Sequence, residues 1–185
     1  MCLSTIFCKS SHILEPPERG LKQKSITGIF HSQEWERTVG CIGTVFGHRV
    51  LHAQLSMDAM QFTTRASFNR VDSSPNGSSS VQSALFSKIR SPAVGSRARA
   101  SRVLNTDTFS LDVESTIPVY DCRNMPLDLS QDLGRLETFT RWTEEIPYGS
   151  FVVVAYTVAV FRAEKNKAWT VSFNLHWAML LGTPA

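Results

Sequence analysis

The sequence has few cysteines, and they lack the spacing of a disulfide framework or a zinc site. Four are present among 185 residues, with no C-x-x-C pair: Cys2, Cys8, Cys41 and Cys122. Disulfide-rich domains and structural zinc sites place their cysteines close together at regular intervals. We therefore expect four free thiols, as in a protein of a reducing compartment.

The sequence also lacks a secretory leader and a long apolar run. Residues 1–8 have no basic stretch ahead of their short apolar run, which a signal peptide requires. The longest apolar run, residues 151–161, is interrupted by Thr157. It falls well short of the ~20 residues that cross a bilayer as a helix. These absences predict an intracellular protein that is not secreted and has no transmembrane helix.

Motifs of catalysis and cofactor binding are missing. The glycine-rich residues 40–47 lack both the Lys-Ser/Thr ending of a phosphate loop and the G-x-G-x-x-G spacing of a dinucleotide site. His48 and His52 have the spacing of a zinc-binding H-E-x-x-H helix, but Arg49 stands where the glutamate is needed, and no third ligand follows. Cys122 has no histidine partner nearby. The sequence favours a non-enzymatic protein with no cofactor and no metal.

Acidic residues are absent between Ser73 and Thr106, where basic residues gather. Five positive side chains lie in this stretch: Lys88, Arg90, Arg97, Arg99 and Arg102. The chain has 19 Lys+Arg and 16 Asp+Glu, so removing these five leaves 14 basic residues against 16 acidic ones. The positive excess of the chain is therefore confined to one stretch.

The basic residues belong to a Ser-rich segment, residues 73–105, that has almost nothing large to bury. Such a segment cannot offset the entropy of ordering it, so we expect it to be flexible. Its five cations can neutralise the phosphates of a nucleic acid without reading the base sequence. They are the nucleic-acid-binding residues that the sequence predicts. An acidic membrane surface would attract the same charges, and a Ser/Arg-rich linker can also be no more than a soluble connection.

The rest of the chain divides into three parts. Residues 1–24, which include Pro16, read as a flexible lead-in. Residues 25–72 are moderately apolar and rich in glycine, and the apolar residues between 39 and 45 alternate with polar or small ones. This pattern is typical of strands broken by bulges or tight turns, which would join the core. Residues 106–185 form the expected β-rich domain.

Within that domain, residues 109–113 alternate between apolar and polar, which predicts a half-buried strand. Pro118 limits the next apolar run to an edge or to the end of a strand. Leucines and a phenylalanine then recur at intervals of three and four residues across 129–139, which predicts one short helix. Asp128 or Ser130 can serve as its N-cap.

The last forty residues carry the clearest pattern. The even positions of residues 151–161 are all apolar. In residues 169–181, large apolar residues occupy the odd positions and polar ones the even positions through His176. These patterns predict an antiparallel hairpin with one face buried and the other in water. Because a lone hairpin is marginal in water, we expect a mainly β fold: an antiparallel sandwich or jelly-roll-like barrel with one short helix and a flexible basic segment.

This layout resembles the small β-barrel proteins of plant RNA viruses. The resemblance is carried by the mobile basic segment and by three later stretches: Leu127-Asp128-Leu129, Phe151–Phe161 and Trp169–Leu181. Two families share it, the jelly-roll coat proteins and the cell-to-cell movement proteins. Residues 106–185 are short for a complete eight-stranded jelly roll, so the movement-protein comparison fits better. It covers the last third of the chain.

The resemblance implies a viral protein that binds single-stranded nucleic acid in the host cytoplasm and moves or packages a genome. It also implies a homo-oligomer. In that role the five cations of residues 73–105 would contact phosphates. The alternative is a β-rich protein–protein interaction module with no nucleic-acid partner, whose exposed strand edge pairs with another chain.

Overall fold

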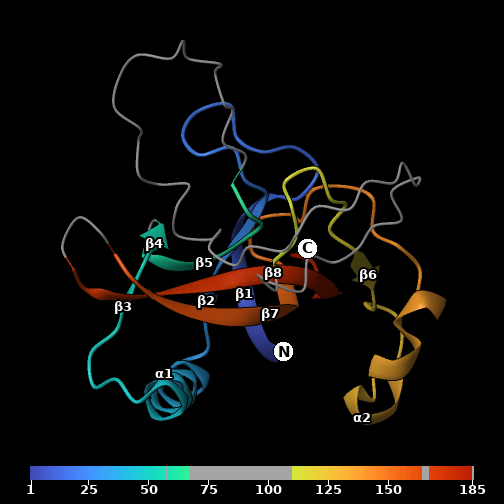
Figure 1. Cartoon of the computed structure of the whole chain (residues 1–185). Helices are drawn as coiled ribbons and strands as arrows, with labels where there is room; N and C mark the ends of the chain where they lie inside the picture. Colours follow the sequence, from blue (N-terminus) through green and yellow to red (C-terminus); the bar gives the residue numbers. More distant parts are fainter. Residues whose placement is uncertain (57, 67–109, 164–166, 185) are drawn as a thin grey trace, which may run out of the picture.

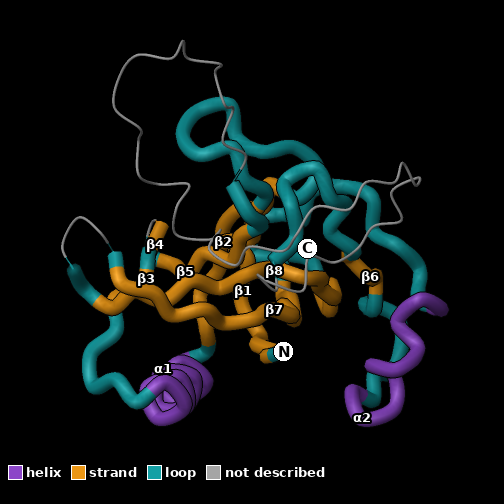
Figure 2. The backbone as a smooth tube through the Cα atoms, viewed as in Figure 1, coloured by secondary structure: helices purple, strands orange, loops and turns teal. Residues whose placement is uncertain are grey.

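The fold is built around one mixed sheet of eight strands (Figure 1). The computed structural model describes residues 1–56, 58–66, 110–163 and 167–184. The prediction of a mainly β protein is confirmed, but the sheet is not purely antiparallel. The strands gather in the middle of the molecule, and two helical regions lie apart from each other beside them (Figure 2).

The predicted C-terminal hairpin is present. Strands β7 (Phe151–Arg162) and β8 (Trp169–Gly182) pair in antiparallel fashion along their whole length, with Arg162 opposite Trp169 next to the turn. β-Branched and aromatic residues dominate both strands, and such residues fit the pleated, half-buried surface of a sheet. This hairpin is the longest continuous ladder among the described strands.

The first strand, β1 (Cys2–His12), lies in the sheet beside β7 instead of forming the expected loose lead-in. Its first half pairs with β7 and its second half with β2 (Ser25–Phe30). Ile6 and Cys8 are buried, whereas Phe7 between them is 49% exposed. The alternation is too short to stand out in a sequence, so only pairing with distant strands shows that this segment is ordered.

Residues 25–63 share the sheet with the C-terminal hairpin. Strand β5 (Ala59–Thr63) pairs antiparallel with β2 and parallel with β8, so the path β8–β7–β1–β2–β5 returns to β8. The two-residue strands β3 (His52–Ala53) and β4 (Leu55–Ser56) extend β8 and β5. Strand pairing therefore surrounds a single apolar interior.

Helix α1 (Ser32–Phe46) replaces the strands expected between residues 39 and 45. Its stripe of Trp35, Val39, Ile42 and Phe46 follows the spacing of three and four residues that places side chains on one helix face. Gly47 ends the helix at φ 69°, a left-handed conformation that glycine adopts without strain. The period-2 interpretation was wrong because β-branched residues and glycines masked this stripe.

The segment after the undescribed residues 67–109 contains less strand than expected. Residues 110–118 form no strand, although a strand was predicted over 109–113, of which 109 lies outside the described residues. Instead, the carbonyl of Leu111 accepts a hydrogen bond from the backbone N–H of Arg65 (2.7 Å). Strand β6 (Val119–Asp121) follows Pro118, where the proline rule placed a strand end, and pairs parallel with β8.

The predicted short helix is present and is capped as expected. In α2 (Leu129–Asp132), the Oδ1 of Asp128 accepts a hydrogen bond from the backbone N–H of Ser130 at 2.9 Å. The helix tightens into the 3-10 helix η2 (Leu133–Thr138), which is interrupted at Arg135. Together with α1, the described chain holds two helical regions where one was expected. None of the described helices is long and apolar enough to cross a membrane.

The two faces of the sheet carry two separate apolar cores. The inner core lies inside the ring of paired strands; its largest fully buried side chains are Ile6, Ile26, Phe62, Tyr156, Leu175 and Leu180. The outer core lies between the sheet and the α2–η2 segment and includes Tyr120, Phe139, Val153, Trp177 and Met179. The sheet is therefore buried on both faces near the C-terminal end of β8.

A bulge at His176 divides β8 between these two cores. Tyr156 pairs with Leu175 and Ala155 with Trp177, so His176 is the extra residue in the ladder. An extra residue reverses the alternation that follows it. Leu175 thus faces the inner core, whereas Trp177 faces the outer one. The prediction that all the large residues of 169–181 share one face was wrong beyond this bulge.

Gly28 and Gly40 give a matched test of the packing. A Cβ at Gly28 would lie 2.5 Å from Ile6 Cδ1 and 2.8 Å from the Phe7 carbonyl oxygen, whereas one at Gly40 would meet nothing within 4 Å. We expect Gly28→Ala to lower the free energy of unfolding by ~1–3 kcal/mol. Gly40→Ala should raise it by ~0.5–1 kcal/mol, because alanine favours the helix. Urea unfolding of both variants checks this, and a Gly28→Ala protein as stable as the parent would contradict the strand register.

Candidate functional site

The five predicted nucleic-acid-binding residues lie outside the described residues. Lys88, Arg90, Arg97, Arg99 and Arg102 all fall within residues 67–109. The undescribed ranges hold seven of the 19 Lys+Arg and three of the 16 Asp+Glu, which leaves 12 basic and 13 acidic residues in the described part. That part is therefore close to neutral, and any anion-binding surface on it must come from the local arrangement of charges.

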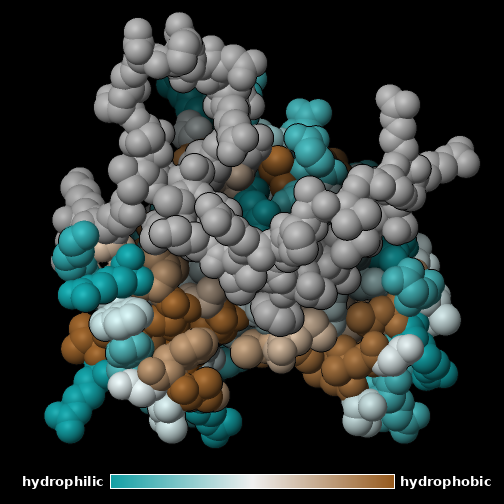
Figure 3. Space-filling view, in the orientation of Figure 1, coloured by the Kyte–Doolittle hydropathy of each residue, from teal (hydrophilic) through white to brown (hydrophobic). Residues whose placement is uncertain are grey.

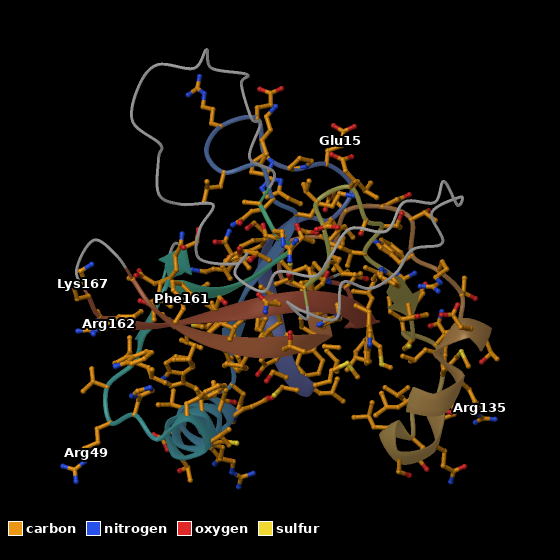
Figure 4. All side chains as sticks on the ribbon, viewed as in Figure 1. Glu15, Arg49, Arg135, Phe161, Arg162 and Lys167 are labelled. Carbon is orange, nitrogen blue, oxygen red and sulfur yellow. The ribbon has the colours of Figure 1, made fainter. Side chains whose placement is uncertain are left out.

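Such an arrangement exists where the β7–β8 hairpin turns, next to the end of α1 (Figure 4). We call it the hairpin-end cluster: His48, Arg49, Arg162, Lys167 and Trp169. Arg162 closes β7 and sits opposite Trp169 at the start of β8. The Trp169 and His48 rings stack with centroids 4.3 Å apart at an interplanar angle of 29°. Residues from two distant segments thus meet at one end of the sheet.

Local structure explains how His48 reaches the hairpin. The left-handed Gly47 turns the chain out of α1, and the backbone N–H of His48 donates to the carbonyl of Gly43 at 3.1 Å. Residues 48–51 then lead into β3, which pairs with the first residues of β8. The end of the helix and the start of β8 are therefore held together by a cap and a short parallel pairing.

The cations of the cluster have no carboxylate partner in the described part of the chain. Within the described residues, neither Arg49, Arg162 nor Lys167 forms an ion pair, whereas four other arginines do. The Nε of Arg162 donates to the Lys167 carbonyl at 3.0 Å, which fixes the arginine across the turn without cancelling its charge. By sequence, the turn residues 164–166 add one acidic and one basic side chain. The cluster is therefore net positive.

Two arginines at the opposite end of the molecule do pair with carboxylates. There Arg141 lies over the Tyr120 ring at 4.2 Å, and Arg123 lies over Trp142 at 4.8 Å. Each arginine also pairs with a carboxylate 2.7 Å away: Asp121 for Arg123, and Glu137 for Arg141. The hydrogen bond from Arg123 lowers the pKa of Asp121 below its ordinary value. Arg141 thus packs against the outer core and Arg123 against a tryptophan beside the inner core, and both leave little charge for a ligand.

An apolar groove of about 250 Å³ adjoins the hairpin-end cluster. We call it the α1 groove; α1 forms one wall, and strands β3, β4 and β8 form the other, with lining residues Trp35, Thr38, Val39, Ile42, Leu51, Ala53, Leu55, Val171 and Phe173. Val39 is 47% exposed and Trp35 38% exposed, so the groove is open to solvent. Figure 3 shows apolar side chains gathered around α1 on this face of the molecule.

The structure offers little for catalysis or metal binding in its described part. No group of three His, Cys, Asp or Glu side chains in the described ranges could hold a metal ion. His48 stacks on Trp169, and His52 pairs with Thr170 in the sheet. At the bulge, His176 Nε2 is hydrogen-bonded to Thr157 Oγ1 at 3.2 Å. The histidines that resembled a zinc motif thus occupy strand and stacking positions.

The hairpin-end cluster was missed by sequence reasoning. The alternation of residues 169–181 placed Trp169 on the buried face with the rest of its strand. Trp169 is instead 41% exposed, because the sheet around it narrows to the hairpin and the two residues of β3. The sequence signal that could have indicated the cluster was a large aromatic residue next to cations at the end of a strand.

Comparison of the chain with protein-family models, curated proteins and solved structures gives no match. The resemblance to plant viral coat and movement proteins therefore stays a prediction.

The four thiols, which form no disulfide, differ in accessibility. Burial, with a smaller contribution from Glu145, raises the pKa of Cys8 to about 11, and burial also raises the pKa of Cys122. Cys2 and Cys41 are exposed. Because the thiolate is the reactive form, we expect a thiol reagent at pH 8 to label Cys2 and Cys41 quickly and the other two only after denaturation. Rapid labelling of all four thiols in the native protein would contradict the position of β1 in the core.

Proposed function

We propose that the protein binds single-stranded nucleic acid without sequence preference and performs no catalysis. The observation that carries the proposal is the hairpin-end cluster. It combines three cations that have no carboxylate partner among the described residues with an exposed aromatic ring. Proteins that bind single strands non-specifically combine these two elements, a positive surface for the backbone and aromatic faces for the bases.

The spread of the cations suits a polymer better than a single small anion. Arg162 and Lys167 flank the hairpin turn, while Arg49 lies away from both (Figure 4). A nucleic acid presents a phosphate at every nucleotide, so separate cations can each contact one. Binding of this kind releases counterions and depends strongly on salt.

The Trp169–His48 pair supplies the stacking surface. A base can extend an existing stack of two rings, and this contact tolerates every base because each has a π face. His48 also holds the tryptophan in one orientation, which reduces the entropy that a mobile side chain would lose on binding.

The proposal includes the basic residues 73–105 and the viral role suggested by the resemblance. Lys88, Arg90, Arg97, Arg99 and Arg102 would add phosphate contacts to those of the hairpin-end cluster. A near-neutral β body joined to a positive segment is the layout of a protein that moves or packages a genome. A jelly-roll-like or sandwich arrangement, intracellular location and homo-oligomeric assembly belong to the same proposal.

A protein–protein interaction module is the second candidate, and two observations favour it. Pairing between β1 and β7 stops at Tyr156, so residues 158–162 of β7 pair only with β8 within the described sheet. Such an edge can accept a strand from another chain. Across the outer face of the sheet, Phe151, Phe7 and Ile29 also form an exposed apolar row on adjacent strands.

Neutralising the hairpin-end cations tests the proposed function. We expect the triple variant Arg49→Gln, Arg162→Gln, Lys167→Gln to bind a single-stranded oligonucleotide more weakly. The slope of log affinity against log salt should also flatten by about 2, since each phosphate contact on a single strand contributes ~0.7. Fluorescence anisotropy over a salt series measures both effects.

Two further variants sharpen this test. Arg135, which pairs with Asp132 on the other side of the molecule, gives the control Arg135→Gln, expected to bind as the parent does. A second triple variant, Arg97→Gln, Arg99→Gln, Arg102→Gln, measures the contribution of the basic segment in the same way. Affinity and slope unchanged in both triple variants would reject the hairpin-end cluster and the basic segment as the binding residues. Absence of oligonucleotide binding by the parent protein would reject nucleic-acid binding and leave the interaction module.

A further inference from the structure

We infer that the α1 groove binds one acyl chain carrying a terminal carboxylate, that is, a medium-chain fatty acid taken up as a single molecule. This inference goes beyond nucleic-acid binding. It shares Arg162 with the proposed nucleic-acid site, but its ligand, its groove and its test involve no nucleic acid. It depends on two observations: the apolar lining of the groove, and the strand register that places Arg162 on the same face of the sheet as the groove residues Val171 and Phe173.

The lining fits a hydrocarbon chain. Eight of the nine lining residues are apolar, and Thr38 alone carries a side-chain hydroxyl. The walls come from one stripe of α1 and from the inner-face positions of β8, so they are held by the helix and the sheet. Apolar cavities of ~150 Å³ stay dry and bind small hydrocarbons. At about 250 Å³, the α1 groove has room for a longer chain.

The register of the hairpin places a cation at the end of this apolar surface. Phe173, Val171 and Trp169 alternate along β8 and share one face of the sheet. Their partners on β7 are Val158, Val160 and Arg162 in the same order. Two apolar pairs are thus followed, on the same face, by the pair of Arg162 and Trp169.

Arg162 is therefore the residue that would bind the carboxylate. Its guanidinium has no carboxylate partner among the described residues, and its Nε is already held by the Lys167 carbonyl. The terminal nitrogens remain for an anion, and arginine–carboxylate hydrogen bonds are strong because both partners are charged. His48, stacked on Trp169, adds a second polar side chain at this end of β8.

The chemistry disfavours other occupants. A neutral hydrocarbon would leave the Arg162 charge unused, and a nucleobase would lose the hydrogen bonds of its edges against a lining that offers one hydroxyl. An acyl carboxylate matches both the apolar lining and Arg162. Burial of its methylenes stabilises the complex, and its charge complements the arginine.

Titration calorimetry of the full-length protein with hexanoate, octanoate and decanoate, each below its micelle concentration, tests the inference. We expect the affinity to rise about fourfold for each added methylene until the groove is filled. Decanol, which has no charge, should bind more weakly than decanoate. Equal affinities for the three acids, or no binding of any, would overturn the inference.

Two variants locate the site. Arg162→Gln should remove the preference for decanoate over decanol while leaving the dependence on chain length. Ala53→Phe, which fills the groove, should lower decanoate affinity at least tenfold. Val45→Phe adds similar bulk to an exposed position of α1 outside the groove and should leave binding unchanged. Urea unfolding confirms that each variant is folded.

The remaining outcomes count against the inference. Wild-type affinity in the folded Ala53→Phe protein would place the ligand elsewhere. Binding to vesicles of an acidic phospholipid, without binding of decanoate, would show that this surface docks on membranes and takes up no single chain. Loss of nucleic-acid binding in the earlier variants has no bearing on these results, so the two proposals fail separately.

Discussion

The structure depends on the long antiparallel ladder between β7 and β8. Four other strands pair with it directly: β1 lies along β7, and β3, β5 and β6 each pair with a different part of the free edge of β8. The remaining strands, β2 and β4, join the sheet through β1 and β5. A two-stranded ribbon is marginal by itself. Its stability here comes from the fact that both faces are covered near the C-terminal end, and this requires the bulge at His176. Without the extra residue, Trp177 and Met179 would compete with Leu175 for the same core.

The same ladder positions the two proposed binding sites. It carries Arg162 and Trp169 to the end of the sheet, where few neighbouring strands cover them, and there α1 delivers His48 onto the tryptophan. The short parallel strand β3 holds the other wall of the α1 groove against β8. Charged and aromatic groups therefore meet at the hairpin turn because of strand register and one helix cap.

The sequence predicted those elements whose signal is local. Four features depend only on neighbouring residues and appear in the structure: the alternation in β7, the alternation in β8 as far as Leu175, the strand boundary at Pro118 and the capping by Asp128. Strand β1 and helix α1 could not be predicted in this way. β1 is ordered by partners more than a hundred residues away in the chain. In α1, the glycines and β-branched residues weaken the helical preference, and packing over the inner core provides the stabilisation.

The hairpin-end cluster was hidden for a related reason. Alternation predicts the face on which a side chain lies, but not how far the neighbouring strands extend to cover it. Trp169 obeys the alternation and is still exposed, because the pairing with β3 begins only at Thr170. The sequence likewise does not show which arginines form ion pairs, because these pairs depend on the folded chain. Predicting a binding surface at the end of a sheet therefore requires the lengths of all the strands, which local sequence patterns do not give.

The four tryptophans provide the most direct test of nucleic-acid binding at the hairpin end. The indole N–H signals can be followed by NMR as a single-stranded oligonucleotide is added to the ¹⁵N-labelled protein. The account predicts that the Trp169 signal shifts in proportion to saturation, while those of Trp142 and Trp177, which lie in or beside the cores, stay in place. Binding of the oligonucleotide with an unmoved Trp169 signal would contradict it.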